Sequence, residues 1–187
     1  MSFAGAIQSG FRNYLNFRGA ATRSEFWYWV LFTVLLGLVV STIESVVWPP
    51  VEFNGDWMQD IASLSTQPTP LSDFLSFALL IPNLSITARR LHDGGFSGKW
   101  LLLLLVPLGY GLLAGAGALV VLNNATGMLT RDELTSLIFL VLPIFALFLA
   151  IMVIFIVLAL KPSRSFYDGN RYVEPEPLDS LDEGTTA

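Results

Sequence analysis

Residues 134–160 read LTSLIFLVLPIFALFLAIMVIFIVLAL, a run of 27 residues that contains no charged side chain. A helix needs about 20 such residues to cross a hydrocarbon core of about 30 Å. At about 1.5 Å per residue the run would form a helix about 40 Å long, so we expect it to tilt or to protrude from the bilayer. The run predicts a membrane-spanning helix.

Three further apolar runs, at residues 26–48, 71–91 and 100–122, have the length of one membrane crossing. The second run is the most polar, because serine, aspartate, asparagine, threonine and proline residues interrupt it. Hydrophobic residues make up 53% of the 187-residue chain and charged residues 13%; the charged share is about half of that in soluble domains. The sequence therefore predicts an all-α polytopic membrane protein, a four-transmembrane-helix bundle.

The positive charges occupy alternate connections between these apolar runs. Segment 49–70 contains no lysine or arginine, and only Arg131 lies between the third and fourth runs. The other basic residues are Arg12, Arg18 and Arg23, then Arg89, Arg90 and Lys99, and finally Lys161, Arg164 and Arg171. Because short cytoplasmic connections retain lysine and arginine, the pattern predicts that both termini are cytoplasmic.

The segment before the first apolar run has the spacing of a short helix. Phe3, Ile7, Phe11 and Leu15 recur at every fourth position, which predicts a helix that lies on the membrane surface. A loosely ordered basic arm is the alternative. The first apolar run is longer than the 7–15 residues of a signal-peptide core, and no cleavage pattern follows it, so we expect it to remain as an anchor.

Two segments lie outside this scheme. Trp57, Ile61 and Leu64 have near-helical spacing and predict a short interfacial helix in the loop between the first two runs. Residues 174–187 are acidic, contain prolines and lack aromatic residues, which predicts a disordered tail. Residues 1–173 then form a single membrane domain.

The composition also excludes several kinds of chemistry. The chain has no cysteine and one histidine, His92, so one chain cannot build a disulfide, a thiol nucleophile or a zinc site with the usual ligands. No lysine or arginine lies deep in an apolar run, and Glu44 and Asp73 lie near run ends where we expect water to reach them. An ion pathway usually leaves buried ionisable residues behind. We expect no cofactor and no nucleic-acid partner.

Residues 22–25, TRSE, have the form of a capping box at the start of the first span. The oxygen of Thr22 would accept from the amide of Glu25, and the carboxylate of Glu25 would accept from the amide of Thr22. This structural role for Glu25 is favoured over a catalytic one. Residues 26–29, FWYW, then predict an aromatic belt at the inner interface.

Residues 88–100, ARRLHDGGFSGKW, place many chemically distinctive groups in one connection. Basic residues suit the negative end of a helix dipole, Gly94 or Gly95 can supply a left-handed cap, and Ser97 can cap the next helix. Arginines, a lysine and glycine amides would also favour an anion such as a phosphate. A true P-loop is excluded, since Trp100 stands at its Ser/Thr position and no strand precedes it.

His92 and Asp93 are adjacent, which invites an acid–base interpretation. Adjacent residues rarely orient each other as a base and its partner, and no nucleophile is evident nearby. We therefore expect a structural or lipid-contacting role for His92.

Small and polar residues interrupt the second and third runs. Pro82 frees the carbonyl one turn earlier, and Asn83, Ser85 and Thr87 can supply hydrogen bonds between helices near it. In the third run, the GxxxG pattern formed by glycines 111 and 115 predicts a close-packing face.

Three segments resemble the domain of unknown function 805 family: residues 17–27 (FRGAATRSEFW), 88–100 and 168–172 (DGNRY). The resemblance covers about residues 10–173 and implies a small, compact, multi-span protein of the bacterial plasma (inner) membrane, without an established activity. Ala20 and Lys99 depart from the family pattern, which usually has arginine and tryptophan there. An anion site that relied on that arginine would therefore have to use Arg18 and Arg23.

We interpret the chain as a non-enzymatic membrane protein that contacts lipid head groups or another membrane protein through its motif-bearing cytoplasmic face. Self-association through Gly111 and Gly115 is one form of such contact. An enzyme or sensor that binds a phosphorylated ligand at the Arg-Arg-Leu-His-Asp loop is the first alternative, and a small transporter is the second.

The candidate contact cluster comprises Arg18, Arg23, Glu25, Arg89, Arg90, His92, Asp93, Lys99, Asp168, Asn170 and Arg171. The three motifs lie at inner ends of spans, where their positive groups would repel one another without acids between them. We therefore expect an ion pair between motifs that joins Arg89 or Arg90 to Glu25 or Asp168, with His92 close by.

Overall fold

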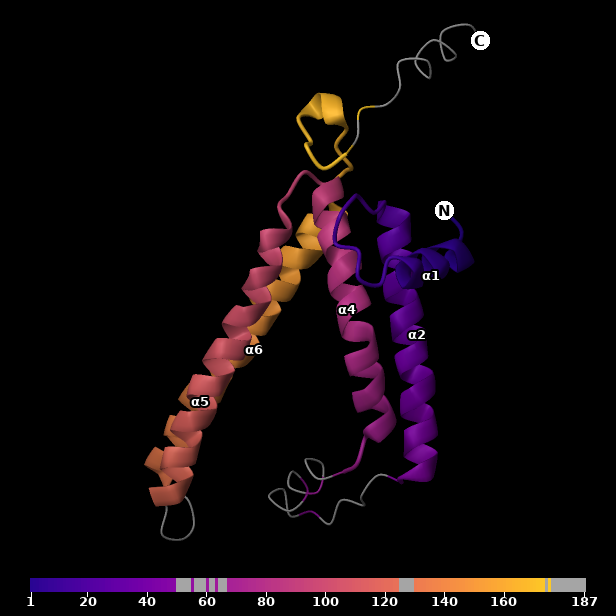
Figure 1. Cartoon of the computed structure of the whole chain (residues 1–187). Coiled ribbons are helices and arrows are strands. Elements are labelled where there is room, and N and C mark those ends of the chain that lie inside the picture. Colours follow the sequence, from indigo (N-terminus) through magenta and orange to yellow (C-terminus); the bar gives the residue numbers. More distant parts are fainter. Residues whose placement is uncertain are drawn as a thin grey trace, which may run out of the picture. The chain divides into compact units, whose positions relative to one another are not determined.

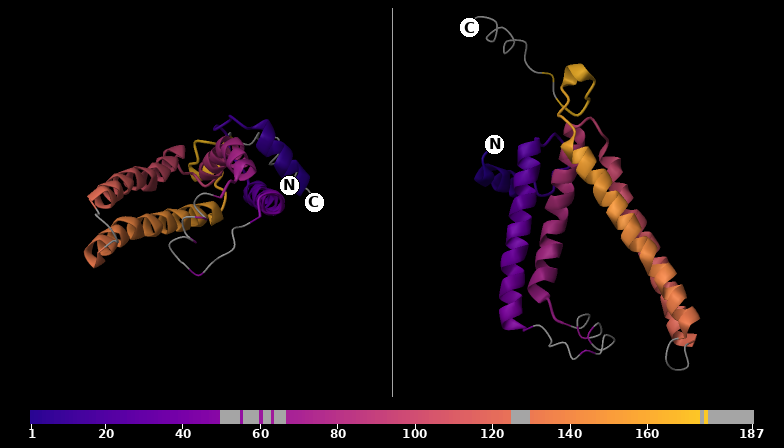
Figure 2. Two further views of the ribbon diagram at one scale, coloured as in Figure 1. Left: turned by 90° about the horizontal axis from the view of Figure 1, so that it is seen from below. Right: turned by 180° about the vertical axis from the view of Figure 1, so that it is seen from behind.

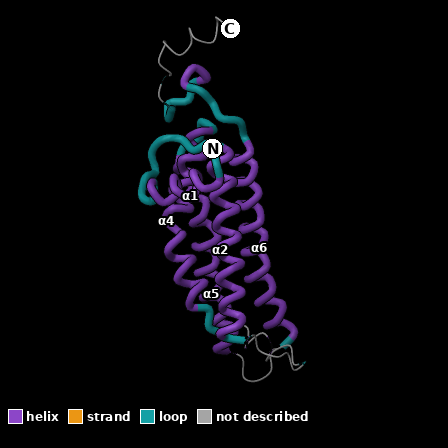
Figure 3. Tube along the Cα trace, turned by 90° about the vertical axis from the view of Figure 1, so that its right-hand side faces the viewer, coloured by secondary structure: helices purple, strands orange, loops and turns teal. Residues whose placement is uncertain are grey.

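A computed structural model describes residues 1–49, 55, 60, 63, 67–124, 130–173 and 175, and within these residues all regular secondary structure is helical (Figures 1 and 3). The longer helices are α1 (Phe3–Arg12), α2 (Arg23–Val47), α4 (Pro70–Asp93), α5 (Leu105–Asn124) and α6 (Arg131–Leu160), with short 3-10 helices η1 (Gly98–Leu104) and η2 (Phe166–Asp168).

Four helical segments are long and apolar enough to cross a membrane: α2, α4, η1 with α5, and α6. This confirms the predicted all-α class and the four spans. The helix predicted around Trp57, Ile61 and Leu64 lies outside the described residues, as does the predicted tail except for Pro175.

The chain divides into two compact units, residues 1–89 and 90–187. The boundary falls between two consecutive arginines near the end of α4. In the first unit, α1 lies across α2 near the start of that helix (Figure 2). The residues predicted to form a surface helix are therefore helical and packed on a neighbour.

Trp29 is the centre of the first unit. Only 1% of its surface is exposed, and Phe11 of α1 packs edge-on against it with ring centroids 5.2 Å apart. Gly10 lies directly over the Trp29 ring, with no room for a side chain between them. The predicted aromatic belt is therefore wrong at Trp29, because α1 covers this residue, whereas Trp27 and Tyr28 are exposed.

Proline and asparagine inside α4 explain how this polar span joins its neighbours. The indole Nε1 of Trp29 donates to Oδ1 of Asn83 at 2.7 Å. Because Pro82 has no N–H, the carbonyl of Ala78 lacks its helical donor, and the Tyr14 hydroxyl donates to that carbonyl at 2.5 Å. The predicted bonds between elements thus occur at Asn83, while Thr87 instead donates to a carbonyl of its own helix.

At the opposite end of these helices, Glu44 of α2 caps the start of α4. Its carboxylate accepts from the amides of Leu71 at 2.6 Å and Ser72 at 2.9 Å, and from the Ser72 hydroxyl. Glu44 is buried, so the expectation that water reaches it is wrong, although Asp73 is exposed. An acid suits this position because the first amides of a helix have no partner within the helix.

The second unit contains the paired helices α5 and α6 (Figure 2). Thr130 and Glu133 form a capping box that starts α6. Ala114 is buried, and a Cβ built on Gly117 would lie 3.3 Å from the Leu140 side chain of α6. The close approach of α5 to α6 therefore uses Gly117.

The predicted GxxxG face does not form that contact. A Cβ built on Gly111 or on Gly115 would have no atom of the described residues within 4 Å.

Gly10→Ala tests the packing of α1 on α2. The added methyl group must displace the Trp29 ring or α1, and overpacking of this kind costs about 1–3 kcal/mol. We expect a lower unfolding temperature in detergent and a changed tryptophan emission spectrum. Gly37→Ala is the matched control: its Cβ meets open space, so it should change stability by less than about 1 kcal/mol, in the stabilising direction. Equal stability of the two variants would contradict the packing.

Candidate functional site

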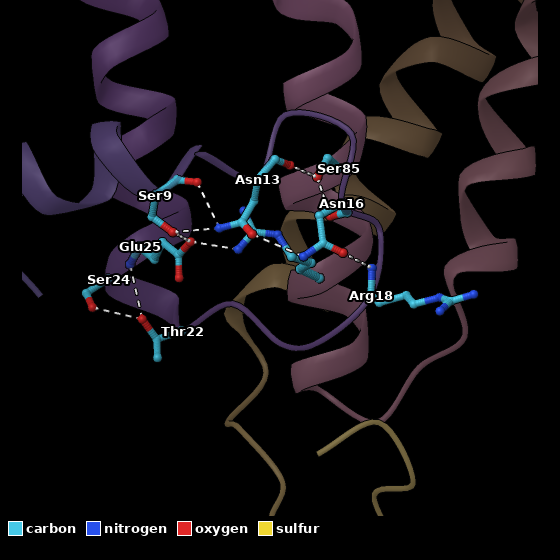
Figure 4. Close-up of polar contacts among 9 residues, drawn as sticks. Ser9, Asn13, Asn16, Arg18, Thr22, Ser24, Glu25 and Ser85 are labelled. Carbon is cyan, nitrogen blue, oxygen red and sulfur yellow. Dashed lines mark hydrogen bonds and ion pairs between the residues drawn. The ribbon is translucent and has the colours of Figure 1, made fainter. Parts of the chain in front are cut away.

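A buried ion pair joins α4 to the start of α2 in the first unit. Nη1 of Arg89 lies 2.9 Å from Oε1 of Glu25, and both residues are buried, with Arg89 only 4% exposed. The Ser9 hydroxyl of α1 donates to the same carboxylate oxygen at 2.8 Å (Figure 4). The expected ion pair between motifs is therefore present as Arg89–Glu25.

The same pair changes the cap of α2. The Thr22 side chain accepts from the Glu25 amide at 3.3 Å, as predicted. The Glu25 carboxylate binds Arg89 and Ser9 instead of completing a capping box. A main-chain hydrogen bond also joins the two segments that the ion pair joins: the Ala21 amide donates to the Arg89 carbonyl at 3.1 Å.

The turn after α1 is fixed to α4 by a serine. Ser85 is buried, and its hydroxyl lies 2.8 Å from the carbonyl of Asn13 and 2.6 Å from that of Asn16. The Asn16 side chain donates to Oδ1 of Asn13 and accepts from the amide of Arg18 (Figure 4). This turn lay outside the predicted cluster, although its two asparagines and the serine in an apolar run were visible in the sequence.

In the second unit, Arg90 closes the end of α6. Nε of Arg90 donates to the Ala159 carbonyl at 2.9 Å, Nη2 donates to the Lys161 carbonyl, and Nη1 pairs with Asp93. The last carbonyls of a helix have no partner within the helix, and the guanidinium supplies donors to two of them. Arg90 is only 1% exposed, so its guanidinium faces these internal acceptors and not solvent.

Asp93 and Asn170 hold the segment that follows α6. The Asp93 carboxylate accepts from the Ser163 hydroxyl at 2.5 Å, and the Asp93 carbonyl accepts from the Arg164 amide at 2.9 Å. Nδ2 of the buried Asn170 lies 2.9 Å from the His92 carbonyl and 3.0 Å from the Arg164 carbonyl. The second and third motifs are therefore joined within this unit.

His92 is half-buried and contacts Tyr172 of the third motif and Gly98 of its own motif. Its ring stacks on Tyr172 with centroids 4.2 Å apart, and its Nε2 accepts from the Gly98 amide at 3.2 Å. The helix that carries His92, α4, ends as predicted. Gly95 has a φ of +81°, and the Phe96 amide donates to the Leu91 carbonyl, which is the pattern of a left-handed glycine cap. This environment favours a structural role for His92.

Asp168, the alternative acid for the expected ion pair, makes no ion pair among the described residues. It accepts from the amide of Ser165 at 3.0 Å and from its hydroxyl at 2.8 Å, forming a capping box around η2. The Ser165 amide and hydroxyl, with a smaller contribution from the charge of Arg164, lower the pKa of Asp168 below its ordinary value. The Ser-x-x-Asp spacing of 165–168 could have revealed this local role.

The remaining basic members of the predicted cluster are exposed: Arg18, Arg23, Lys99 and Arg171. Two hollows adjoin some of them. One, of about 550 Å³, is lined by Arg12, Leu15, Asn16, Phe17 and Arg18. The other, of about 370 Å³, is lined by Ser97, Lys99, Trp100, Leu102 and Leu103. Across the described residues there is no group of three or more acidic or histidine side chains that could hold a metal ion.

Comparison with known proteins assigns the chain to a group of membrane proteins. The sequence model of the family described as "Protein of unknown function (DUF805)" matches residues 14–173. The chain is similar to the inner membrane protein YhaI of Escherichia coli (strain K12), with 29% identity over 51% of this chain and 67% of that protein. It is also similar to the inner membrane protein YhaH of the same strain, with 27% identity over 51% of this chain and 69% of that protein. No solved structure matches.

The Arg89–Glu25 pair gives a direct test of this site. Arg89→Met leaves the carboxylate buried without its cation, and Glu25→Gln removes the charge that Arg89 needs. Breaking a buried pair from either side should cost about 3–5 kcal/mol. Equilibrium unfolding in mixed micelles would measure these costs.

The double variant Glu25→Gln with Arg89→Met should be less destabilised than the sum of the two single variants, since no uncompensated charge stays buried. Arg23→Met removes an exposed arginine of the same segment and should change stability by at most about 0.5 kcal/mol. Additive single-variant costs would contradict a direct pair.

Proposed function

The chain belongs to the DUF805 family, and on this basis we propose that it is a non-enzymatic bacterial inner-membrane protein that contacts anionic lipid head groups through the exposed basic groups of its motifs. We further propose that both termini face the cytoplasm. The observation that carries the proposal is the division of charge in the site. The motif arginines that are buried pair with acids, whereas Arg18, Arg23, Lys99 and Arg171 are exposed.

Exposed basic groups at helix ends suit a membrane surface. Each lysine or arginine near an anionic bilayer contributes about 1 kcal/mol of attraction. Exposed aromatic residues accompany the cations, including Trp27 beside the first motif and Trp100 beside Lys99. Aromatic side chains of this kind favour the region between water and hydrocarbon.

The phosphorylated-ligand alternative has weaker support. Arg89 and Arg90 donate to internal partners, and His92 stacks on Tyr172. A ligand that recruited Arg90 would replace bonds at the end of α6, and one that recruited Nη1 of Arg89 would break its pair with Glu25. Nε of Arg89 has no partner among the described residues, but it is buried. Of the basic groups of that loop, Lys99 is the exposed one.

A membrane-protein partner is a second proposal, and it has one specific observation in its favour. The face of α5 that carries Gly111 and Gly115 has open space around both glycines. Small residues let helix backbones approach closely in a membrane. A second copy of the chain could use this face without displacing α6.

The absence of cysteine makes orientation straightforward to test. We expect a single cysteine at Gly55 to react with a membrane-impermeant maleimide in intact cells. Cysteines at Ala20 and Pro162 should react only after the membrane is permeabilised, because the basic connections are retained inside. Labelling of Ala20→Cys but not of Gly55→Cys in intact cells would reverse the proposed orientation.

Lipid preference tests the proposed activity. Native mass spectrometry of the purified protein should detect phosphatidylglycerol bound roughly tenfold more tightly than phosphatidylcholine with the same acyl chains, since two or more basic groups at about 1 kcal/mol each exceed the 1.4 kcal/mol of a tenfold difference. Equal retention of the two lipids would reject the head-group proposal.

A further inference from the structure

The larger hollow belongs to the turn between α1 and α2. Its lining combines the side chains of Arg12 and Arg18 with those of Leu15 and Phe17, in a volume of about 550 Å³. Sites for small molecules commonly enclose about 300–1,000 Å³ and combine apolar walls with a few polar groups. The hollow falls within this range of volume and has this mixed lining, but it is an open depression on the surface and not an enclosed cavity.

The charge in this region is positive and without internal compensation. Among the described residues, neither Arg12 nor Arg18 makes an ion pair through its guanidinium. No acidic residue precedes Glu25 in the chain, and Glu25 is buried against Arg89. Two exposed guanidinium groups on a short turn attract an anion that can accept several hydrogen bonds, for which a phosphate is well suited.

The apolar part of the lining indicates that the ligand is a lipid. Leu15 is 71% exposed and Phe17 is 39% exposed, so both present apolar surface outside the packed core. Phe3 and Phe11 of α1 are exposed to a similar degree as Phe17. A water-soluble phosphate would leave this surface in water, whereas a phospholipid covers it with glycerol and acyl-chain atoms.

The main chain of the turn is already fixed before any ligand arrives. The Ser85 hydroxyl bonds with the carbonyls of Asn13 and Asn16, and the Tyr14 hydroxyl donates to the Ala78 carbonyl of α4. The Arg18 amide donates to the Asn16 side chain. A site held in this way loses less conformational entropy on binding than a mobile loop does.

We infer that the turn spanning residues 12–18 is a binding site for a single anionic phospholipid, with Arg12 and Arg18 on its phosphate and with Leu15 and Phe17 against its glycerol and acyl chains. This inference rests on the proposed function and assigns it to one site. Among the described residues, none that lines the hollow carries a carboxylate to receive the ammonium group of a zwitterionic lipid. The site therefore selects lipids of net negative charge, such as phosphatidylglycerol.

The test compares the wild-type protein with the double variant Arg12→Ala, Arg18→Ala in native mass spectrometry, with phosphatidylglycerol and phosphatidylcholine of identical acyl chains as probes. We expect the double variant to bind phosphatidylglycerol at least tenfold more weakly, because it lacks both of the cations that attract the phosphate. Arg131→Ala is the control, since Arg131 is exposed but lies outside the three motifs and does not line the hollow.

Three further measurements make the result interpretable. Unchanged helical circular dichroism and thermal unfolding of the double variant would establish that the loss is not misfolding. The double variant Arg12→Lys, Arg18→Lys retains the charge without the planar donor arrangement of arginine. We therefore expect it to bind phosphatidylglycerol more weakly than the wild type does and more tightly than Arg12→Ala, Arg18→Ala does. Inorganic phosphate at the same concentration as the lipid should not displace phosphatidylglycerol.

The outcomes separate this site from the broader proposal. A wild-type preference for phosphatidylglycerol that persists in the Arg12→Ala, Arg18→Ala variant would overturn the site and leave the proposed function standing. The absence of any preference in the wild type would overturn both. A loss of equal size in Arg131→Ala would show that general charge, not this turn, binds the lipid. Displacement by inorganic phosphate would overturn the lipid assignment in favour of a soluble anion.

Discussion

A buried guanidinium group is stabilised when its charge is neutralised and its donors find acceptors, and α4 carries two buried arginines in succession. Both pair with acids, although the buried Nε of Arg89 has no hydrogen-bond partner among the described residues. Arg89 finds Glu25 in the first unit, where the Ala21 amide also binds the Arg89 carbonyl. Arg90 finds Asp93 and the last carbonyls of α6 in the second unit. The two consecutive arginines thus make polar contacts with α2, which precedes them in the sequence, and with the end of α6, which follows them. Their position at the end of an apolar span explains why such costly groups are tolerated there.

Polar groups inside α4 follow the same rule. Pro82 leaves the Ala78 carbonyl unpaired, and Tyr14 supplies the missing donor. Asn83 binds Trp29, and Ser85 binds the turn after α1. The bonds at Ala78, Asn83 and Ser85 thereby attach α4 to α2 or to the turn between α1 and α2, whereas Thr87 bonds within α4. The first unit is held together by these bonds as well as by the apolar packing around Trp29.

The sequence predicted the features that follow from apolar runs, from turn residues and from the balance of charges. Apolar runs located the four spans to within a few residues, Gly95 was one of two candidates for the left-handed cap, and the need for acids among the arginines led to Arg89–Glu25. The contacts of Trp29, Glu44 and Arg90 could not be predicted in this way, because each depends on which helix end lies beside the residue. Asp168 is different, since a local Ser-x-x-Asp signal was present. That the three motifs share one surface stays a prediction.

The polar character of α4 also bears on how the protein enters the membrane. α4 is the least hydrophobic of the four spans and a larger share of it is buried than of the others. Alone in lipid it would expose Asn83 and Ser85, and the amides of its first turn, without partners, which costs several kcal/mol for each unsatisfied group. Their partners, Trp29, Glu44 and the turn after α1, all precede α4 in the chain. Synthesis from the N-terminus therefore makes these polar partners before it makes α4, so that the insertion of α4 into the membrane is coupled to the helices made earlier.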